Sequence, residues 1–214
     1  MNFGLCRILL TTILGEIAPG TQFGPTIIGA PNDVAWDFLT IQFYAQYVQN
    51  YVFSPAGVLG ATLDHPAADA LAYDFPVSGK GWDSQGLATM SGGIGWHLSP
   101  EEFLGVLKAF RRGGVIMSAA QAQGMLDNMF GIEERGSTPI GPYYRRKGYW
   151  QSGTKVEQSL VYFLPQDMEL AVFVNSPIGP TKEPLEPVVL GALMANFPVN
   201  EAALRIPFDR SPQR

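Results

Sequence analysis

The feature that most constrains the fold is a change of hydrophobic period near residue 140. Before it, apolar residues recur every three or four positions, as they do in helices. After it come segments rich in Tyr, Phe and Val, which are typical of strands: "PYYRRKGYW", "QSLVYFLP" and "ELAVFVNS". The turn "PQDM" separates the last two segments and predicts an antiparallel hairpin. The segment "EPVVLGALMANF" then predicts a closing helix. We therefore expect an α/β chain of the α+β type, in which a C-terminal helix packs on an antiparallel sheet of at least three strands.

The segment "SPEEFLGVLKAFRRGG" carries the clearest helix signal. Ser99 suits the N-cap, Pro100 suits the first helical position, and Glu102 completes a capping box. Gly113 is the expected stop. The apolar residues of its buried stripe are Phe103, Leu107 and Phe110. A further short helix follows Ser118, its expected cap.

Two helices are expected before it. Leu5, Leu9 and Ile13 recur every four residues and indicate an amphipathic helix, although a basic residue followed by an apolar run also fits a signal peptide. Asp33 is a possible cap for the second helix. The expected face of that helix consists of Leu39, Phe43, Tyr47 and Tyr51.

Composition excludes several classes of partner. The chain is 46% hydrophobic and 15% charged, which is typical of a chain that builds a core, and its net charge of −5 gives no sign of a nucleic-acid partner. Cys6 is the only cysteine, and the histidines, His65 and His97, lie far apart in sequence. No metal, cofactor or internal disulfide is predicted. No run reaches the ~18 apolar residues of a membrane span. The localisation stays open.

A Ser-x-x-Lys pattern, Ser152 to Lys155, is found in "YRRKGYWQSGTK". This is the nucleophile pattern of penicillin-recognising enzymes. The surrounding residues, "QSGTKVEQ", predict a glycine-containing turn between strands and not a helix start. Because residues three apart on a strand point to opposite faces, we expect the two side chains not to meet. Ser84 and Ser91 have no plausible base in the sequence, although Ser91 could face substrate from a loop.

The order of the segments resembles the second half of the beta-lactamase-related serine hydrolases, which include class C beta-lactamases, penicillin-binding proteins and esterase relatives. The matching pieces are "NFGLCRILL", "FYAQYVQNYVFSPAGV", "SGGIGWHLSPEEFLGVL", "YYRRKGYW" and "SLVYFLPQDMELAVFVNS". The resemblance implies that residues 1–197 are the C-terminal half of such a domain and that residues 198–214 are a surface tail. It also implies acyl-serine hydrolysis of an ester, amide or lactam.

The family places a Lys-Thr-Gly, or a His-x-Gly in the esterases, on a sheet strand beside the nucleophile. Arg146, Lys147 and Gly148 resemble this element, and Tyr149 would then present an oxyanion N–H. A register shifted by one residue, Lys147 to Tyr149, is the alternative, and an ordinary edge strand with exposed cations is another. Trp150, beside this strand site, is the tryptophan most suited to face substrate.

The other two family elements are absent from this sequence. No tyrosine is followed two residues later by asparagine, and the family's Ser-x-x-Lys would lie upstream of Met1. We expect that Met1 lies inside the gene of a longer protein, or that the chain descends from one that lost its front half. Such a chain would be inactive alone and would self-associate or bind a complementing N-terminal fragment. The alternative is a non-catalytic binding or interaction protein derived from the same fold.

Overall fold

The computed structural model describes residues 5–23, 32–66, 70–77, 79–83 and 85–196. The chain forms two compact units. The first consists of Met1–Leu71 and Gly81–Ala119, and the second of Ala72–Lys80 and Ala120–Arg214. The expected boundary between residues 197 and 198, and the expected tail, lie outside the described residues.

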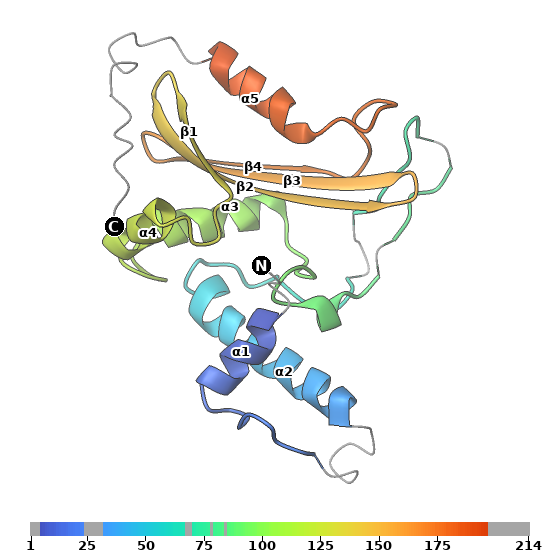
Figure 1. Cartoon of the computed structure of the whole chain (residues 1–214), viewed down its shortest axis with the longest axis vertical. Helices are drawn as coiled ribbons and strands as arrows, with labels where there is room; N and C mark the ends of the chain where they lie inside the picture. The colour runs from blue at the N-terminus through green and yellow to red at the C-terminus, as the bar shows by residue number, and fades with distance from the viewer. Residues whose placement is uncertain (1–4, 24–31, 67–69, 78, 84, 197–214) are drawn as a thin grey trace, which may run out of the picture. The chain divides into compact units, whose positions relative to one another are not determined.

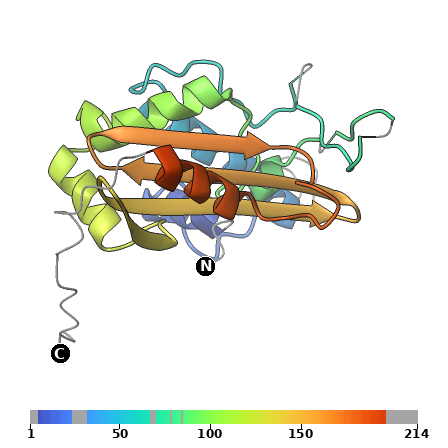
Figure 2. The ribbon, with the colours of Figure 1, turned by 90° about the horizontal axis from the view of Figure 1, so that it is seen from above.

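The second unit contains a four-stranded antiparallel sheet of order β1-β2-β3-β4. Two helices belong to the same part of the chain, and Figures 1 and 2 show α5 lying along one face of the sheet. The elements are β1 (Glu134–Thr138), β2 (Gly141–Ser152), β3 (Lys155–Leu164), β4 (Met168–Val174), α4 (Ala119–Asp127) and α5 (Leu185–Asn196). The α+β class, the antiparallel sheet and the closing helix are thus confirmed.

Strand β1 is the element that the period change did not predict. Its sequence, "ERGST", carries two charges and a glycine and shows no apolar alternation. It forms a strand because its partner provides the ladder, with Glu134 opposite Arg145 and Gly136 opposite Tyr143. A strand with so little β-propensity is decided by tertiary pairing and not by its own residues.

The core of the second unit lies between the sheet and α5. Its buried residues come from alternate positions of the strands, which point to one face. They are Tyr143, Leu160, Tyr162 and Leu164, and Leu185 of α5 is buried with them. Val189, Leu190 and Leu193 of α5 pack against them. The expectation that the closing helix covers the hairpin face is confirmed.

The first unit is helical. Its elements are α1 (Leu5–Ile13), α2 (Asn32–Val48), α3 (Pro100–Lys108), π-helical turns at Gln49–Phe53 and Ala109–Gly113, and a 3-10 turn at Ala88–Met90. The described part of residues 57–98 is mostly irregular. A small core of Phe53, Val58 and Ala61 is packed by Trp96, whose ring meets that of Phe53 edge-on at 4.7 Å.

Helix α1 forms as predicted, but its apolar stripe does not face the core. Leu5, Leu9 and Ile13 are 52%, 54% and 79% exposed. The buried residues are instead Arg7 and Thr11. Hydrogen bonds offset the cost of burying the Arg7 charge. Its guanidinium donates to Asp37 Oδ1 at 2.8 Å, to Thr40 Oγ1 at 2.5 Å and to the carbonyl oxygen of Thr89 at 3.2 Å.

The second and third helices also test the expected caps. Helix α2 begins at Asn32, so Asp33 lies in its first turn and is not the cap. In α3 the capping box is confirmed: Ser99 Oγ accepts from the Glu102 amide, and the Glu102 carboxylate accepts from the Ser99 amide. The left-handed residue that ends the following π-helical turn is Gly114 rather than Gly113.

Candidate functional site

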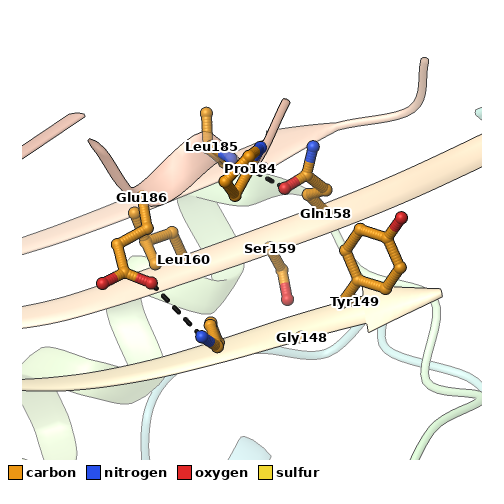
Figure 3. Close-up of a pocket in the computed structure, with 9 residues that line it drawn as sticks. Gly148, Tyr149, Gln158, Ser159, Leu160, Pro184, Leu185 and Glu186 are labelled. Carbon is orange, nitrogen blue, oxygen red and sulfur yellow. Dashed lines mark hydrogen bonds and ion pairs between the residues drawn. The ribbon is translucent and has the colours of Figure 1, made fainter. Parts of the chain in front are cut away.

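A hollow opens on the second unit where β2 and β3 meet the chain that enters α5 (Figure 3). Its volume is 140 Å³, less than half of the ~300 Å³ at which pockets for drug-sized ligands begin, so it suits one small group. It is lined by Lys147, Gly148, Tyr149, Gln158, Ser159, Leu160, Pro184, Leu185 and Glu186. Three of the five predicted site residues therefore take part.

The alternation of the strand separates the predicted residues into two groups. Lys147 and Tyr149 pair with Leu160 and Gln158, which belong to the face that carries α5. Arg146 and Trp150 occupy the intervening positions and point to the opposite face, and neither lines the hollow. The five residues proposed from the sequence are thus contiguous in the chain but do not share one surface.

Gly148 lies directly opposite Ser159 in the ladder. A Cβ at Gly148 would meet Ser159 Oγ at 2.4 Å, which is closer than real contacts allow. In Figure 3 the Ser159 side chain points toward Gly148. The room left by this glycine is therefore taken by a hydroxyl of the neighbouring strand.

The outer edge of β2 is unpaired beside the hollow. Strand β1 pairs with β2 only as far as Arg145, and no other strand of the described chain continues along this edge. The carbonyl of Arg145 accepts from the Glu133 amide on the β1 side. Because the N–H and C=O groups of alternate residues point to the same edge, those of Lys147, Tyr149 and Gln151 point to the open one. The Tyr149 amide is thus presented outward, and the Tyr149 side chain is 53% exposed.

A charged cluster lies next to the hollow. Arg145 is 3% exposed, and its guanidinium forms ion pairs with Glu134 of β1 and with Glu186 of α5. Lys147 Nζ lies 3.3 Å from Glu186 Oε2 and 3.6 Å from Glu133 Oε1. The positive charge of Lys147 at the hollow is therefore balanced by carboxylates of the same unit.

These contacts shift the titration of Glu186. The hydrogen bond from the Arg145 guanidinium is the main cause that lowers the pKa of the Glu186 carboxyl, and the Lys147 ammonium adds to it. Burial raises the pKa of the neighbouring Tyr143 hydroxyl, which donates to Glu134 Oε1 at 2.6 Å. Glu186 is thus ionised over a wider pH range than an ordinary glutamate.

Gln158 fastens the chain that enters α5. It is 6% exposed, and both ends of its amide are bonded: Nε2 donates to the Glu183 carbonyl at 3.0 Å, and Oε1 accepts from the Leu185 amide at 2.7 Å. The second bond satisfies an N–H at the first residue of the helix, a group that helices leave without an internal partner. Gln158 therefore fixes one wall of the hollow.

The serines singled out in the sequence lie elsewhere. The turn predicted at "QSGTKVEQ" is present, with Gly153 in the left-handed region at φ 59°. Ser152 and Lys155, however, are cross-strand partners on either side of it, so the expectation that they point to opposite faces is wrong. They belong to two strands and not to one. Ser91 is fully buried and does not face substrate, and Ser84 lies outside the described residues.

Sequence reasoning missed Ser159, Gln158 and Glu186 as partners of the β2 residues. Ser159 and Gln158 became visible only with the strand register, which follows from the two-residue turn at Gly153. Glu186 lies in the first turn of α5, where carboxylates are common because they complement the helix dipole, so its position carries no distinct functional signal.

Neither a metal site nor a membrane span is found in the part of the chain that the structure describes. That part contains no cluster of three or more His, Cys, Asp or Glu side chains able to hold a metal ion. Its helices are too short or too polar to cross a bilayer. Comparison with family models, with curated proteins and with solved structures found no significant match.

The contact between Gly148 and Ser159 makes a prediction for stability. Gly148→Ala should lower the free energy of unfolding by about 1 kcal/mol, because the added methyl forces the Ser159 hydroxyl or the strand to move. In a Ser159→Ala background the same change should cost little, since the next atom, Ser159 Cβ, lies 3.7 Å from the new methyl. Urea unfolding of the four proteins gives the coupling energy.

Gly124→Ala is the matched control for this cycle. Gly124 lies within α4, and a Cβ there meets nothing within 4 Å. Alanine at this position should stabilise the helix by about 0.5–1 kcal/mol. Equal effects of Gly148→Ala with and without the Ser159 hydroxyl would contradict the proposed contact.

The lowered pKa of Glu186 makes a prediction for pH dependence. Since the folded-state pKa lies below the unfolded one, the stabilisation is complete above the ordinary glutamate value of 4.5 and is lost as pH falls through the folded value. Glu186→Gln should therefore cost more stability at pH 7 than at pH 3. Urea midpoints at the two pH values measure this, with Glu101→Gln as a control outside the cluster. A pH-independent cost would show that the charge of Glu186 is not involved.

Proposed function

We propose that this chain forms the sheet wall of an acyl-serine hydrolase site of the beta-lactamase-related type. The substrate is an ester, an amide or a lactam. The observation that carries the proposal is the backbone N–H of Tyr149, which points to the unpaired edge of β2 beside a hollow lined by Lys147 and Gly148. The α+β arrangement, with a C-terminal helix on an antiparallel sheet, is consistent with the family resemblance.

In this proposal the Tyr149 amide donates to the oxygen that becomes negatively charged when a carbonyl is attacked. An outward N–H on a strand is held rigidly by the ladder on its other side, so the donor needs little reorganisation when charge develops. The strand presents both N–H and C=O groups at Lys147, Tyr149 and Gln151, so an extended substrate can align along the same edge.

The role of Lys147 follows from its ion pairs. Glu186 and Glu133 hold its ammonium at 3.3 and 3.6 Å, so Lys147 is oriented and its charge is partly compensated. Because its charge is already paired, the Lys147 ammonium is better suited to positioning the substrate at the rim of the site than to binding an anionic group of the substrate. In this proposal the Arg-Lys-Gly sequence keeps the positive charge of the family's Lys-Thr-Gly element, and the ion pairs of Lys147 with Glu186 and Glu133 weaken that charge.

In this proposal the nucleophilic serine belongs to a segment that is not part of this sequence. Ser152, the only serine followed three residues later by lysine, lies at a hairpin turn. It lacks the helix start that lowers the barrier to proton transfer in the family. The chain alone should therefore bind weakly and should not turn over substrate.

The second candidate function is a non-catalytic binding or interaction module. The specific observation in its favour is the same open edge, because three outward residues of an unpaired strand can accept an added strand from a partner. Such a module would use the edge without any acyl-enzyme step. A self-associating chain or a complementing N-terminal fragment are the partners expected from the sequence.

The edge amide can be tested by nitrogen-15 NMR of the intact chain titrated with benzylpenicillin. We expect saturable shifts centred on the Tyr149 amide. Tyr149→Pro removes the outward N–H together with the ring, and it should abolish the shifts at the neighbouring residues of the edge with little effect on the ladder. Tyr149→Ala keeps the N–H and is the matched control that should retain them. Shifts that survive Tyr149→Pro, or that never include residues 147–151, would contradict the oxyanion assignment.

A fluorophosphonate label separates the catalytic reading from the binding one. We expect no stoichiometric labelling of any serine in the pure chain. Stoichiometric labelling of Ser152 would overturn the assignment of the nucleophile to another segment. Shifts on the edge with an extended peptide but not with benzylpenicillin would favour the interaction module.

A further inference from the structure

The tyrosine-rich face of α2 lines a second hollow, which lies wholly within the first unit. Its volume is 260 Å³. It is formed by the end of α1, the turn that follows and the last turns of α2 with the π-helical turn. The lining residues are Leu10, Thr11, Leu14, Glu16, Phe43, Gln46, Tyr47, Asn50 and Tyr51.

The residues expected to share one face of α2 do so, but that face is only partly buried. Tyr51 is 61% exposed and Leu14 is 47% exposed. The fully buried positions of α2 are Ala35 and Thr40, which lie outside the aromatic row. Phe43, Tyr47 and Tyr51 therefore line an open groove, and their side chains are not fully buried in the core of the unit.

The walls of the groove suit a positive charge. The rings of Tyr47 and Tyr51 lie 4.8 Å apart at an angle of 40°, and Phe43 stands one turn earlier on the same helix. The face of an aromatic ring attracts cations through its quadrupole. Glu16 adds a carboxylate at the groove, and no Lys, Arg or His is among the lining residues.

The polar groups of the groove are also available. Within the described residues, the Glu16 carboxylate forms no ion pair, and the Tyr47 and Tyr51 hydroxyls have no hydrogen-bond partner. The side-chain amides of Gln46 and Asn50 are likewise unbonded in that part of the chain. These groups contrast with Tyr143, Tyr144 and Gln158 of the second unit, whose side chains are all hydrogen-bonded.

We propose that this groove binds a small organic cation, an alkylammonium group whose charged head lies against Tyr47, Tyr51 and Glu16. Its apolar part would lie over Leu10 and Leu14. The volume, below the ~300 Å³ at which drug-sized pockets begin, limits the head to about the size of a trimethylammonium group. The net charge of −5 also favours the approach of a cation over that of an anion. The proposal does not depend on the hydrolase proposal.

Choline is the probe, and 3,3-dimethyl-1-butanol, which replaces the charged nitrogen by carbon, is the matched neutral ligand. Both are titrated into the intact chain at constant ionic strength, with the tyrosine ring signals followed by NMR. We expect saturable binding of choline with shifts at Tyr47 and Tyr51, and binding of the alcohol weaker by about tenfold. Equal affinity for the two ligands would overturn the proposal, because shape and not charge would then be recognised.

Two variants locate the binding. Tyr51→Ala and Glu16→Gln should each weaken choline binding by about fivefold. Tyr51→Phe keeps the ring and should bind within about twofold of the unchanged chain. Since Tyr51 and Glu16 are exposed, folding should be preserved in all three variants. Unchanged affinity in Tyr51→Ala, no saturable binding at all, or signal changes explained by concentration-dependent self-association would each overturn the proposal.

Discussion

The second unit depends on the buried charge of Arg145. Its guanidinium is almost fully buried and pairs with Glu134 of β1 and with Glu186 of α5. Removing both carboxylates would leave the buried guanidinium uncompensated, a change that typically costs about 3–5 kcal/mol, whereas removing one leaves the other in place. Arg145 of β2 thereby links the edge strand β1 and the first turn of α5 through its two ion pairs. The same cluster contacts Lys147 and lies where the β1–β2 ladder gives way to the open edge of β2.

The two hollows call for different chemistry. The hollow beside β2 is small and charge-balanced, and it lies next to outward backbone amides, which are suited to a carbonyl oxygen or an extended chain. The hollow beside α2 is aromatic and carries one carboxylate that forms no ion pair with the described residues, which suits a cation. Each is built wholly within one compact unit. Neither site requires the other, so the two proposals can fail separately.

Local signals predicted most elements but little of their exposure. The capping box at Ser99, the hairpin turn at "PQDM" and the closing helix are present as expected. The predicted apolar stripe on α1 is exposed, and the buried face of the helix carries Arg7, whose burial is compensated by polar partners. Ser152 and Lys155 are cross-strand partners on either side of a turn, a placement that the sequence pattern alone does not specify. Periodicity identifies a face, but only a neighbour decides whether the face is covered.

The amino-acid sequence by itself determined the α+β class, the position of the basic-x-Gly strand and the absence of a Ser-x-x-Lys at a helix start. These are local properties, set by period, turn chemistry and residue identity. The tertiary structure alone decided that the β1–β2 ladder extends along β2 only as far as Arg145, that Ser159 occupies the space over Gly148, and that the tyrosine row of α2 faces a groove. Each of these depends on strand register or on contacts between residues distant in the chain, and neither is specified by the pattern of any single segment.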